Sequence, residues 1–527
     1  MPRTRWPLAL LAMTAFVAGP LPASADTSAA NSLDATVAGI DLDAATIPDL
    51  QHRMDRGRLT SVRLTAAYLR RIAALDGKIH SIVALNGRAL AEAAASDARR
   101  RAGRTLGQLD GIPVLLKDNV DTRQLPTTAG SRALSRTEPA ADAHLVTRLY
   151  RGGAVLLGKT NLSEWANFRS TNATSGWSGV GGQTNNPHVL DRNPCGSSSG
   201  SGAAIAATLA QVAIGTETDG SIVCPAGANG IVGHKPTLGL VSRGGVVPIA
   251  AEQDTGGPMT RHVVDAAITL SVLQGRDQAD PATREIPAGQ PTDYAALLRS
   301  DALRGARIGV WRKSGLDADA DRVTEAAART LRAKGATVVD VVLPFQDEVN
   351  ENEFPALVTE FRRDLTDYLA KRPGKPDTLG ELVEFNRKDP VELSKFGQEI
   401  FEQAVTAPAP SDPVYRRQRE TATTLARRSI DDTLSHYRLD AIMAPTNSPA
   451  WKTTYGTGDA FVLGSSTPAA VAGYPNISVP AGYAGPLPIG VSFFAGRWSD
   501  ADVLKLAAAF ERANPARRAP AFVPTIG

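Results

Sequence analysis

Residues 111–119 read Gly-Ile-Pro-Val-Leu-Leu-Lys-Asp-Asn, a short apolar run that ends at Lys117. A continuous apolar run of this length is typical of a strand that is buried on both faces of a sheet. Similar runs occur over 154–157 and 212–215, and segments with helical spacing separate them. Strands that alternate with helices predict an α/β protein with a largely buried sheet. Residues 162–166 are expected to begin one of the helices.

The size and charge of the chain exclude several classes of protein. Its 527 residues can bury a large core without cross-links. It has 57 lysine and arginine residues against 54 aspartate and glutamate residues, which gives a net charge of only +3. Proteins that bind nucleic acid or anionic membranes usually carry a strong basic patch, so we expect neither partner.

The first 25 residues have the three parts of a secretory signal peptide. Arg3 and Arg5 form a short positive region, residues 7–19 form an apolar run, and residues 23–25 (Ala-Ser-Ala) form a small-residue cleavage site. The apolar run is too short to span about 30 Å of hydrocarbon, which argues against a membrane anchor. We therefore expect a periplasmic or secreted protein that has no membrane contact after cleavage.

The rest of the chain shows no linker that would divide it into independent halves. After cleavage near Ala25, residues 26–45 are expected to form a loose leader and residues 46–527 the folded domain. A polar, mostly helical block over about 346–436 predicts a variable insertion or lid.

Two segments match known motifs in their letters but not in their context. Residues 153–160 fit the phosphate-loop pattern G-x4-G-K-T, yet their central Ala-Val-Leu-Leu favours a buried strand, so nucleotide binding is not expected. Residues 196–200 fit the nucleophile-elbow pattern G-x-S-x-G, but turn-forming residues rather than a strand precede them. A Ser-His-Asp hydrolase with Ser198 as nucleophile therefore stays as an alternative.

The histidines and cysteines give no sign of a metal centre. The seven histidines show no H-x3-H or H-E-x-x-H pair, so we expect neither a metal nor another cofactor. In an oxidising compartment Cys195 and Cys224 could form a disulfide or remain two thiols, and the sequence leaves both open.

Three segments carry residues suited to acyl transfer. Lys117, at the end of a buried strand, would lose hydration, which lowers its pKa and lets the neutral amine act as a general base. Residues 194–202 (Pro-Cys-Gly-Ser-Ser-Ser-Gly-Ser-Gly) permit close backbone approach. Residues 215–225 (Gly-Thr-Glu-Thr-Asp-Gly-Ser-Ile-Val-Cys-Pro) follow a strand and offer a hydroxyl beside exposed N–H groups. Each segment alone could also be structural: a surface lysine, helix caps, or a capped turn.

Together and in this order, the three segments resemble the amidase signature family. The resemblance extends from about Asp49 to near Ala513, and the spacing of Ser197 and Ser221 agrees with that of the family. It implies a single large α/β domain that has a mixed central sheet covered by helices on both faces and that hydrolyses amides. The resemblance also includes residues 158–164, 440–445, 472–480 and 487–491.

The resemblance also implies a Ser–cis-Ser–Lys triad. Ser221 would be the nucleophile, and Lys117 would be the general base. Ser197, which would follow a cis peptide bond from Gly196, would pass protons between them. The oxyanion hole would consist of the backbone N–H groups of Thr218, Asp219, Gly220 and Ser221.

The chain departs from the commoner family pattern at two positions. Asp219 stands where a glycine is usual, and Val223 stands where an arginine is usual. Asp219 is expected to constrain the oxyanion turn. The sequence of residues 217–225 resembles that of the family branch that contains bacterial peptide amidases.

The expected substrate is therefore a small-molecule or peptide carboxamide, with the C-terminal amide of a peptide favoured. The alternatives are another aliphatic or aryl amidase or esterase, a glutamyl-tRNA amidotransferase of the A type, and a catalytically silent binding protein. The signal peptide argues against the tRNA-dependent alternative. Substrate choice is expected to lie in residues 346–436 and 176–182, and the sequence indicates no oligomeric state.

Overall fold

A mixed sheet of eleven strands lies at the centre of the computed structural model, which describes residues 35–526. The strands are β3 (Ile82–Leu85), β4 (Pro113–Lys117), β5 (Val155–Thr160), β8 (Val212–Glu217), β9 (Val232–Lys235), β10 (Thr255–Thr260), β11 (Arg307–Val310), β12 (Thr337–Asp340), β13 (Ala441–Pro445), β14 (Asn476–Ala484) and β15 (Leu487–Phe494). Their order across the sheet is β12-β11-β13-β15-β14-β9-β10-β8-β4-β5-β3. The predicted signal peptide and residues 26–34 of the predicted leader lie outside the described residues, whereas in the rest of the leader Val37, Ile40 and Leu42 are buried in the main core.

The sheet is parallel where the predicted catalytic lysine lies. β4 pairs in parallel with β5 on one side and with β8 on the other, whereas β8 and β10 are antiparallel. All five residues of β4 are buried, as the apolar run predicts. Because neighbouring parallel strands end at the same edge of a sheet, Lys117 at the end of β4 lies close to the turn that follows β8.

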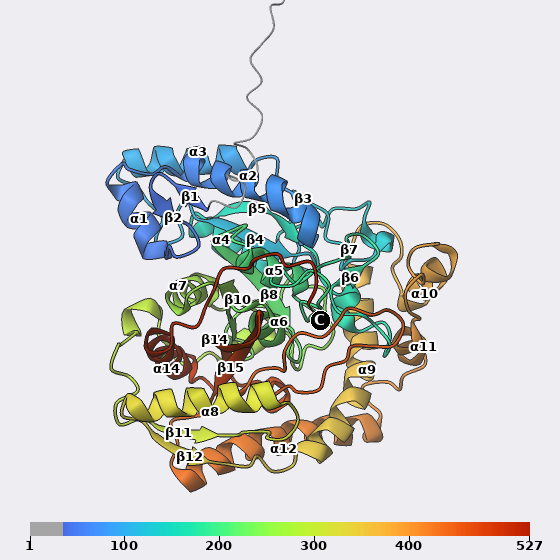
Figure 1. Ribbon diagram of the computed structural model, residues 1–527. Helices are drawn as coiled ribbons and strands as arrows, with labels where there is room; N and C mark the ends of the chain where they lie inside the picture. The colour runs from blue at the N-terminus through green and yellow to red at the C-terminus, as the bar shows by residue number, and fades with distance from the viewer. Residues whose placement is uncertain (1–34, 527) are drawn as a thin grey trace, which may run out of the picture. The chain divides into compact units, whose positions relative to one another are not determined.

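Helices cover both faces of the sheet (Figure 1). α5 and α6 contact each other and the middle strands, while α7, α14 and α8 contact the same strands as a second group. The α/β fold with helices on both faces is thus confirmed. The helices of the described residues are α1 (Ile47–Asp55), α2 (Ser61–Ile79), α3 (Ala89–Arg101), α4 (His144–Arg151), α5 (Ser199–Ala206), α6 (Val223–Asn229), α7 (Val263–Leu273), α8 (Ala318–Ala333), α9 (Gln346–Ala370), α10 (Leu379–Lys388), α11 (Glu399–Val405), α12 (Pro413–Tyr437), α13 (Thr467–Ala472) and α14 (Asp500–Ala513).

The block over residues 346–436 is helical in the structure, as expected. α9 and α12 pack against each other, and α10 and α11 pack against α9 (Figure 1). Their buried apolar residues form a separate small core that includes Phe361, Leu382 and Phe401. Two short hairpins outside the large sheet complete the strands: β1 (Thr36–Val37) with β2 (Ile40–Asp41), and β6 (Trp177–Ser178) with β7 (Gly182–Gln183).

The helix expected to begin at residues 162–166 does not form. Only a 3-10 turn is present over Glu164–Asn167, and Trp165, Ala166 and Asn167 have φ angles of 50°, 54° and 71°. The backbone N–H of Trp165 donates to the carbonyl of Ala129, and its ring packs edge-on against Phe401. Contacts with distant segments therefore override the local helical preference.

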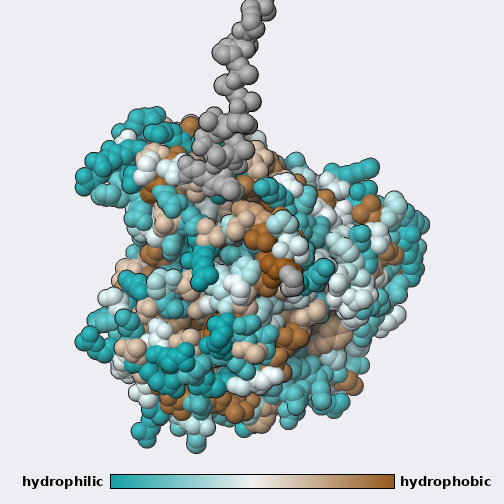
Figure 2. Space-filling model, in the orientation of Figure 1, coloured by the Kyte–Doolittle hydropathy of each residue, from teal (hydrophilic) through white to brown (hydrophobic). Residues whose placement is uncertain are grey.

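Within residues 35–526, no helix combines the length and the apolar composition that crossing a membrane requires. Figure 2 shows a mainly hydrophilic surface over α3 and α8, with hydrophobic residues in scattered groups between them.

Candidate active site

Lys117 is fully buried at the end of β4, and its side-chain nitrogen contacts two side chains and one carbonyl. Nζ lies 2.7 Å from Oγ of Ser197, 2.9 Å from Oγ1 of Thr216 and 3.1 Å from the carbonyl oxygen of Thr216. Burial lowers the pKa of Lys117 to about 7, although the charges of Asp254 and Glu217 act in the opposite direction. A lysine with this pKa is largely neutral just above pH 7 and can accept a proton from the Ser197 hydroxyl.

Ser197 lies on a loop that packs against two other segments of the site. The peptide bond between Gly196 and Ser197 is cis, as the family resemblance implies. The backbone N–H of Ser163 donates to the carbonyl of Ser197 at 3.0 Å, and the N–H of Ser198 donates to the carbonyl of Ser221 at 3.1 Å. These two backbone hydrogen bonds fix the loop between the segment after β5 and the turn that carries Ser221.

Ser221 lies in the turn between β8 and α6, beside a row of free backbone donors. Gly220 adopts φ 78°, a left-handed conformation that favours glycine. The side chain of Glu217 accepts hydrogen bonds from the N–H groups of Ile222 and Val223, which holds the start of α6. Within residues 35–526, no hydrogen-bond acceptor is found for the backbone N–H groups of Thr218, Asp219, Gly220 and Ser221. Such a row of donors can bind an oxyanion.

A cavity of about 210 Å³ brings these groups together. Ser197, Ser221, Thr218 and Asp219 line one part of it. Its remaining wall is mostly apolar and is formed by Ala166, Asn167, Phe168, Gly196, Ile249 and Leu357. Leu357 belongs to the helical block that was expected to set substrate choice. Residues 176–182 do not line this cavity; their expected part in substrate choice stays a prediction.

The sequence motifs assign no role to several polar residues that lie near the site. Thr216 binds the lysine through both its carbonyl and its hydroxyl, and the amide of Asn119 donates to the same hydroxyl at 2.9 Å. Asp254 accepts the Thr218 hydroxyl at 2.5 Å, and burial raises the pKa of this carboxyl to about 7. The only sequence signal for Thr216 is its position two residues before Thr218, within the segment 215–225.

Cys195 and Cys224 form a disulfide, which settles the question that the sequence left open. Cys195 lies two residues before Ser197, and Cys224 lies three residues after Ser221. Both are buried. The cross-link therefore joins the loop that carries Ser197 to the start of α6, directly after the turn that carries Ser221.

The motifs that matched only in their letters have structural roles here. Residues 155–160 form β5, and the fully buried Lys159 makes a 3.0 Å ion pair with Asp118. The hydroxyl of Ser198 donates to the Thr216 carbonyl, and no histidine of residues 35–526 is among its hydrogen-bond partners. In residues 35–526, no three histidine, cysteine, aspartate or glutamate side chains are grouped as a metal ion would require.

Asp219 and Val223, the two departures from the family pattern, lie in and just after the turn that carries Ser221. The side chain of Asp219 accepts a hydrogen bond from the Thr467 hydroxyl at 2.7 Å. This contact ties Asp219 to α13. Val223 is buried at the start of α6, and its N–H group binds Glu217.

Proteins of similar sequence and structure include a peptide amidase, a probable amidase and an amidotransferase component. The native peptide amidase from Stenotrophomonas maltophilia is 47% identical, with a TM-score of 0.87 over 91% of this chain and 99% of that chain. A probable amidase of Arabidopsis thaliana is 38% identical over 500 residues, 92% of each chain. The A-type component of the glutamyl-tRNA(Gln) amidotransferase of Roseiflexus castenholzii is 35% identical, covering 89% of this chain and 95% of its own.

The family comparison covers the same residues as the site. The family model described as Amidase matches residues 63–504, which include β4, the Gly196–Ser197 loop and the turn after β8. The buried lysine, the serine that it contacts and the second serine beside the N–H donors all lie within the residues that the family model matches. The chain belongs to the amidase signature family and is an amide-hydrolysing enzyme.

Proposed function

We propose that this enzyme hydrolyses carboxamides through an acyl-enzyme on Ser221 and that its substrate is the C-terminal amide of a peptide. The observation that carries the mechanism is the 2.7 Å contact between the buried Lys117 amine and Ser197, at the wall of a cavity that Ser221 shares. A serine hydroxyl is a weak nucleophile until a base accepts its proton, and this contact supplies the base.

In the first half of the reaction, the Ser221 oxygen attacks the carbonyl carbon of the amide. Its proton passes to Ser197, and the proton of Ser197 passes to the neutral amine of Lys117. Ser197 can relay because one hydroxyl both donates and accepts a hydrogen bond. The carbonyl electrons move to oxygen, where the N–H groups of residues 218–221 stabilise the charge. Removing one such donor typically slows an enzyme by about 100-fold to 1,000-fold.

The same relay then runs in reverse. The C–N bond breaks as the nitrogen takes a proton from the Lys117 ammonium through Ser197, and ammonia leaves. Water attacks the acyl-enzyme and gives its proton to the relay. Ser221 regains its proton as the carboxylic acid departs, so the enzyme ends in its starting protonation state.

The peptide-amide substrate is supported by similarity and by the cavity. The native peptide amidase of Stenotrophomonas maltophilia shares 47% of its aligned residues with this chain. The apolar wall formed by Phe168, Ile249 and Leu357 suits an uncharged side chain next to the scissile amide. We further propose that the enzyme acts after export, which the signal-peptide pattern and the Cys195–Cys224 disulfide both support.

Ammonia release from matched amides tests the substrate proposal. The panel holds an N-acetylated dipeptide amide with an apolar last residue, isobutyramide, benzamide and free glutamine, with the Ser221→Ala variant as control. We expect the highest kcat/KM for the dipeptide amide and no release by the variant. Turnover of only the aliphatic or aryl amide would overturn the peptide assignment, and turnover of only glutamine would favour an amidotransferase-like role.

A further inference from the structure

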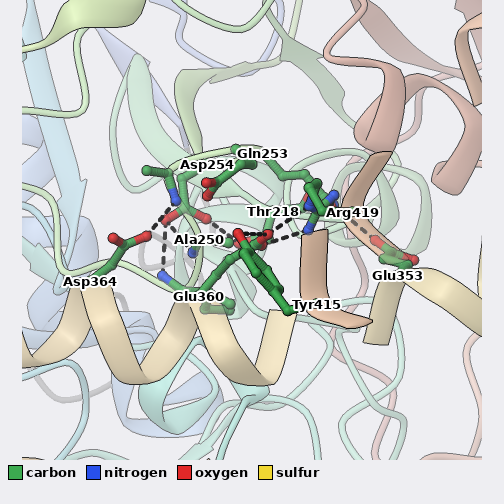
Figure 3. Close-up of polar contacts among 12 residues, drawn as sticks. Thr218, Ala250, Gln253, Asp254, Glu353, Glu360, Asp364, Tyr415 and Arg419 are labelled. Carbon is green, nitrogen blue, oxygen red and sulfur yellow. Dashed lines mark hydrogen bonds and ion pairs between the residues drawn. The ribbon is translucent and has the colours of Figure 1, made fainter. Parts of the chain in front are cut away.

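Two consecutive residues just before β10 hold the peptide unit at the start of the oxyanion turn (Figure 3). Asp254 accepts the hydroxyl of Thr218 at 2.5 Å, and the side-chain amide of Gln253 donates from Nε2 to the carbonyl oxygen of Thr218 at 3.3 Å. Gln253 is 1% exposed, so water does not compete for these contacts.

The amide of Gln253 is itself held in one orientation by the two long helices α9 and α12. Arg419 of α12 donates from Nη1 to Oε1 of Gln253 at 2.7 Å. The Nε2 of Gln253 donates to Oε1 of Glu353 of α9 at 2.8 Å. Arginine can only donate hydrogen bonds, so it fixes Oε1 on its own side and points the N–H groups toward Glu353 and Thr218.

Arg419 is in turn fixed by a second set of contacts in the same helices. Its guanidinium binds both carboxylate oxygens of Glu360, at 2.6 Å from Nε and 2.5 Å from Nη2. The hydroxyl of Tyr415 donates to Glu360 at 3.0 Å. A two-point contact between a planar guanidinium and a carboxylate sets direction as well as distance. Figure 3 shows these side chains meeting between the helices and the Thr218 turn.

The geometry of a peptide bond links the Thr218 carbonyl to catalysis. In a trans peptide unit, the carbonyl oxygen and the next N–H point in opposite directions. The bond between Thr218 and Asp219 is not among the cis bonds of the chain. When the Thr218 carbonyl is held toward Gln253, the Asp219 N–H, which is one of the free donors, therefore points away from Gln253.

We propose that Gln253, braced by Arg419 and Glu353, is a positioning residue for the oxyanion hole, because it fixes the plane of the Thr218–Asp219 peptide. The inference rests on the proposed acyl-transfer function. The helical block over residues 346–436 would then both line the cavity and hold the residue that positions the oxyanion turn. Gln253 itself does not line the cavity, so it acts only through the turn.

The test compares Gln253→Met with a matched control, Glu252→Gln. Methionine keeps the length of the side chain but cannot donate to Thr218. Glu252 is the neighbouring residue and binds Arg363 of α9 at 2.6 Å, so its variant disturbs the same loop and helix without a Thr218 contact. The substrate is whichever amide the wild type hydrolyses in the ammonia panel, and active sites are counted by exhaustive fluorophosphonate labelling.

We expect Gln253→Met to lower kcat by about 10-fold to 100-fold, part of the loss seen when a donor is removed outright, with KM within about threefold of wild type. A peptide aldehyde, whose adduct with Ser221 places an oxyanion in the hole, should lose affinity by the same factor. Glu252→Gln should keep its kcat. An unchanged kcat in Gln253→Met, or an equal loss in Glu252→Gln, would overturn the proposal.

Arg419→Lys provides a second variant if Gln253→Met folds poorly. It keeps the positive charge beside Glu360 but loses the forked contact, so we expect a smaller fall in kcat at constant KM. A lower melting temperature with unchanged kcat per labelled site would mean a purely structural role and would overturn the inference. If the wild type hydrolyses no amide of the panel, the proposed function fails. The rate of fluorophosphonate labelling in the same variants then still reports on Gln253.

Discussion

Replacing Lys117 by methionine tests whether the buried amine is neutral in the folded enzyme. Burial lowers the pKa of this lysine from 10.5 to about 7, whereas the unfolded chain keeps the ordinary value. Each pKa unit corresponds to about 1.4 kcal/mol, so the full penalty is about 5 kcal/mol, of which about 4 kcal/mol remains at pH 7, where the folded lysine is half deprotonated. The penalty is fully present below pH 7 and disappears as the pH rises toward 10.5, where the unfolded lysine also loses its proton.

In Lys117→Met, the free energy of unfolding lacks the pH dependence that the lysine contributes. The difference in unfolding free energy, variant minus wild type, should therefore fall by about 4 kcal/mol between pH 7 and pH 10.5. Loss of the contacts to Ser197 and Thr216 shifts both ends of this comparison alike, so the slope isolates the titration. Denaturant unfolding of both proteins at four pH values measures it. Parallel curves would refute the argument, because they would mean that Lys117 is charged at neutral pH and cannot act as the base.

The remaining predictions concern the nucleophile and the cross-link. Ser221→Ala should abolish fluorophosphonate labelling without changing the unfolding midpoint, and Ser198→Ala should still be labelled; the reverse pattern would favour a Ser-His-Asp hydrolase. Replacing Cys195 and Cys224 together by alanine should lower the free energy of unfolding by about 3–4 kcal/mol, the loop-closure value for a separation of 29 residues. Denaturant unfolding measures this loss, and an unchanged midpoint would show that the disulfide contributes nothing.

The sequence could predict the parts of the fold that depend on local pattern. The apolar run before Lys117 predicts β4, because a strand that is buried on both faces needs successive apolar residues. All five residues of β4 are indeed buried. The same reasoning recognises residues 155–160 as a strand despite their phosphate-loop letters.

β10 could not be predicted, since its sequence Thr-Gly-Gly-Pro-Met-Thr contains three residues that usually break strands. It nevertheless lies between β8 and β9 in the middle of the sheet. The glycines are needed there, because a side chain at Gly257 would collide with the carbonyl of His234. Close packing against distant residues determines this strand, and a local sequence pattern does not contain that information.

The residues around the site that sequence reasoning missed are brought together by long-range contacts. Arg419 and Gln253 are 166 residues apart in the chain, and Tyr415 and Glu360 are 55 apart. None of them lies in a segment with a recognisable motif. Pairings of this kind depend on how α9 and α12 pack, which only the folded structure displays.

The helical pair α9 and α12 has a consequence for engineering this enzyme. α9 supplies Leu357 to the cavity wall, and both helices reach Gln253 through Glu353 and Arg419. A chimera that imports this block from a relative to gain a new substrate would also replace the groups that hold the amide of Gln253. The same two helices therefore contribute to substrate binding and to the support of Gln253. A successful exchange has to keep Glu353 and Arg419, which bind Gln253, while it changes the cavity wall.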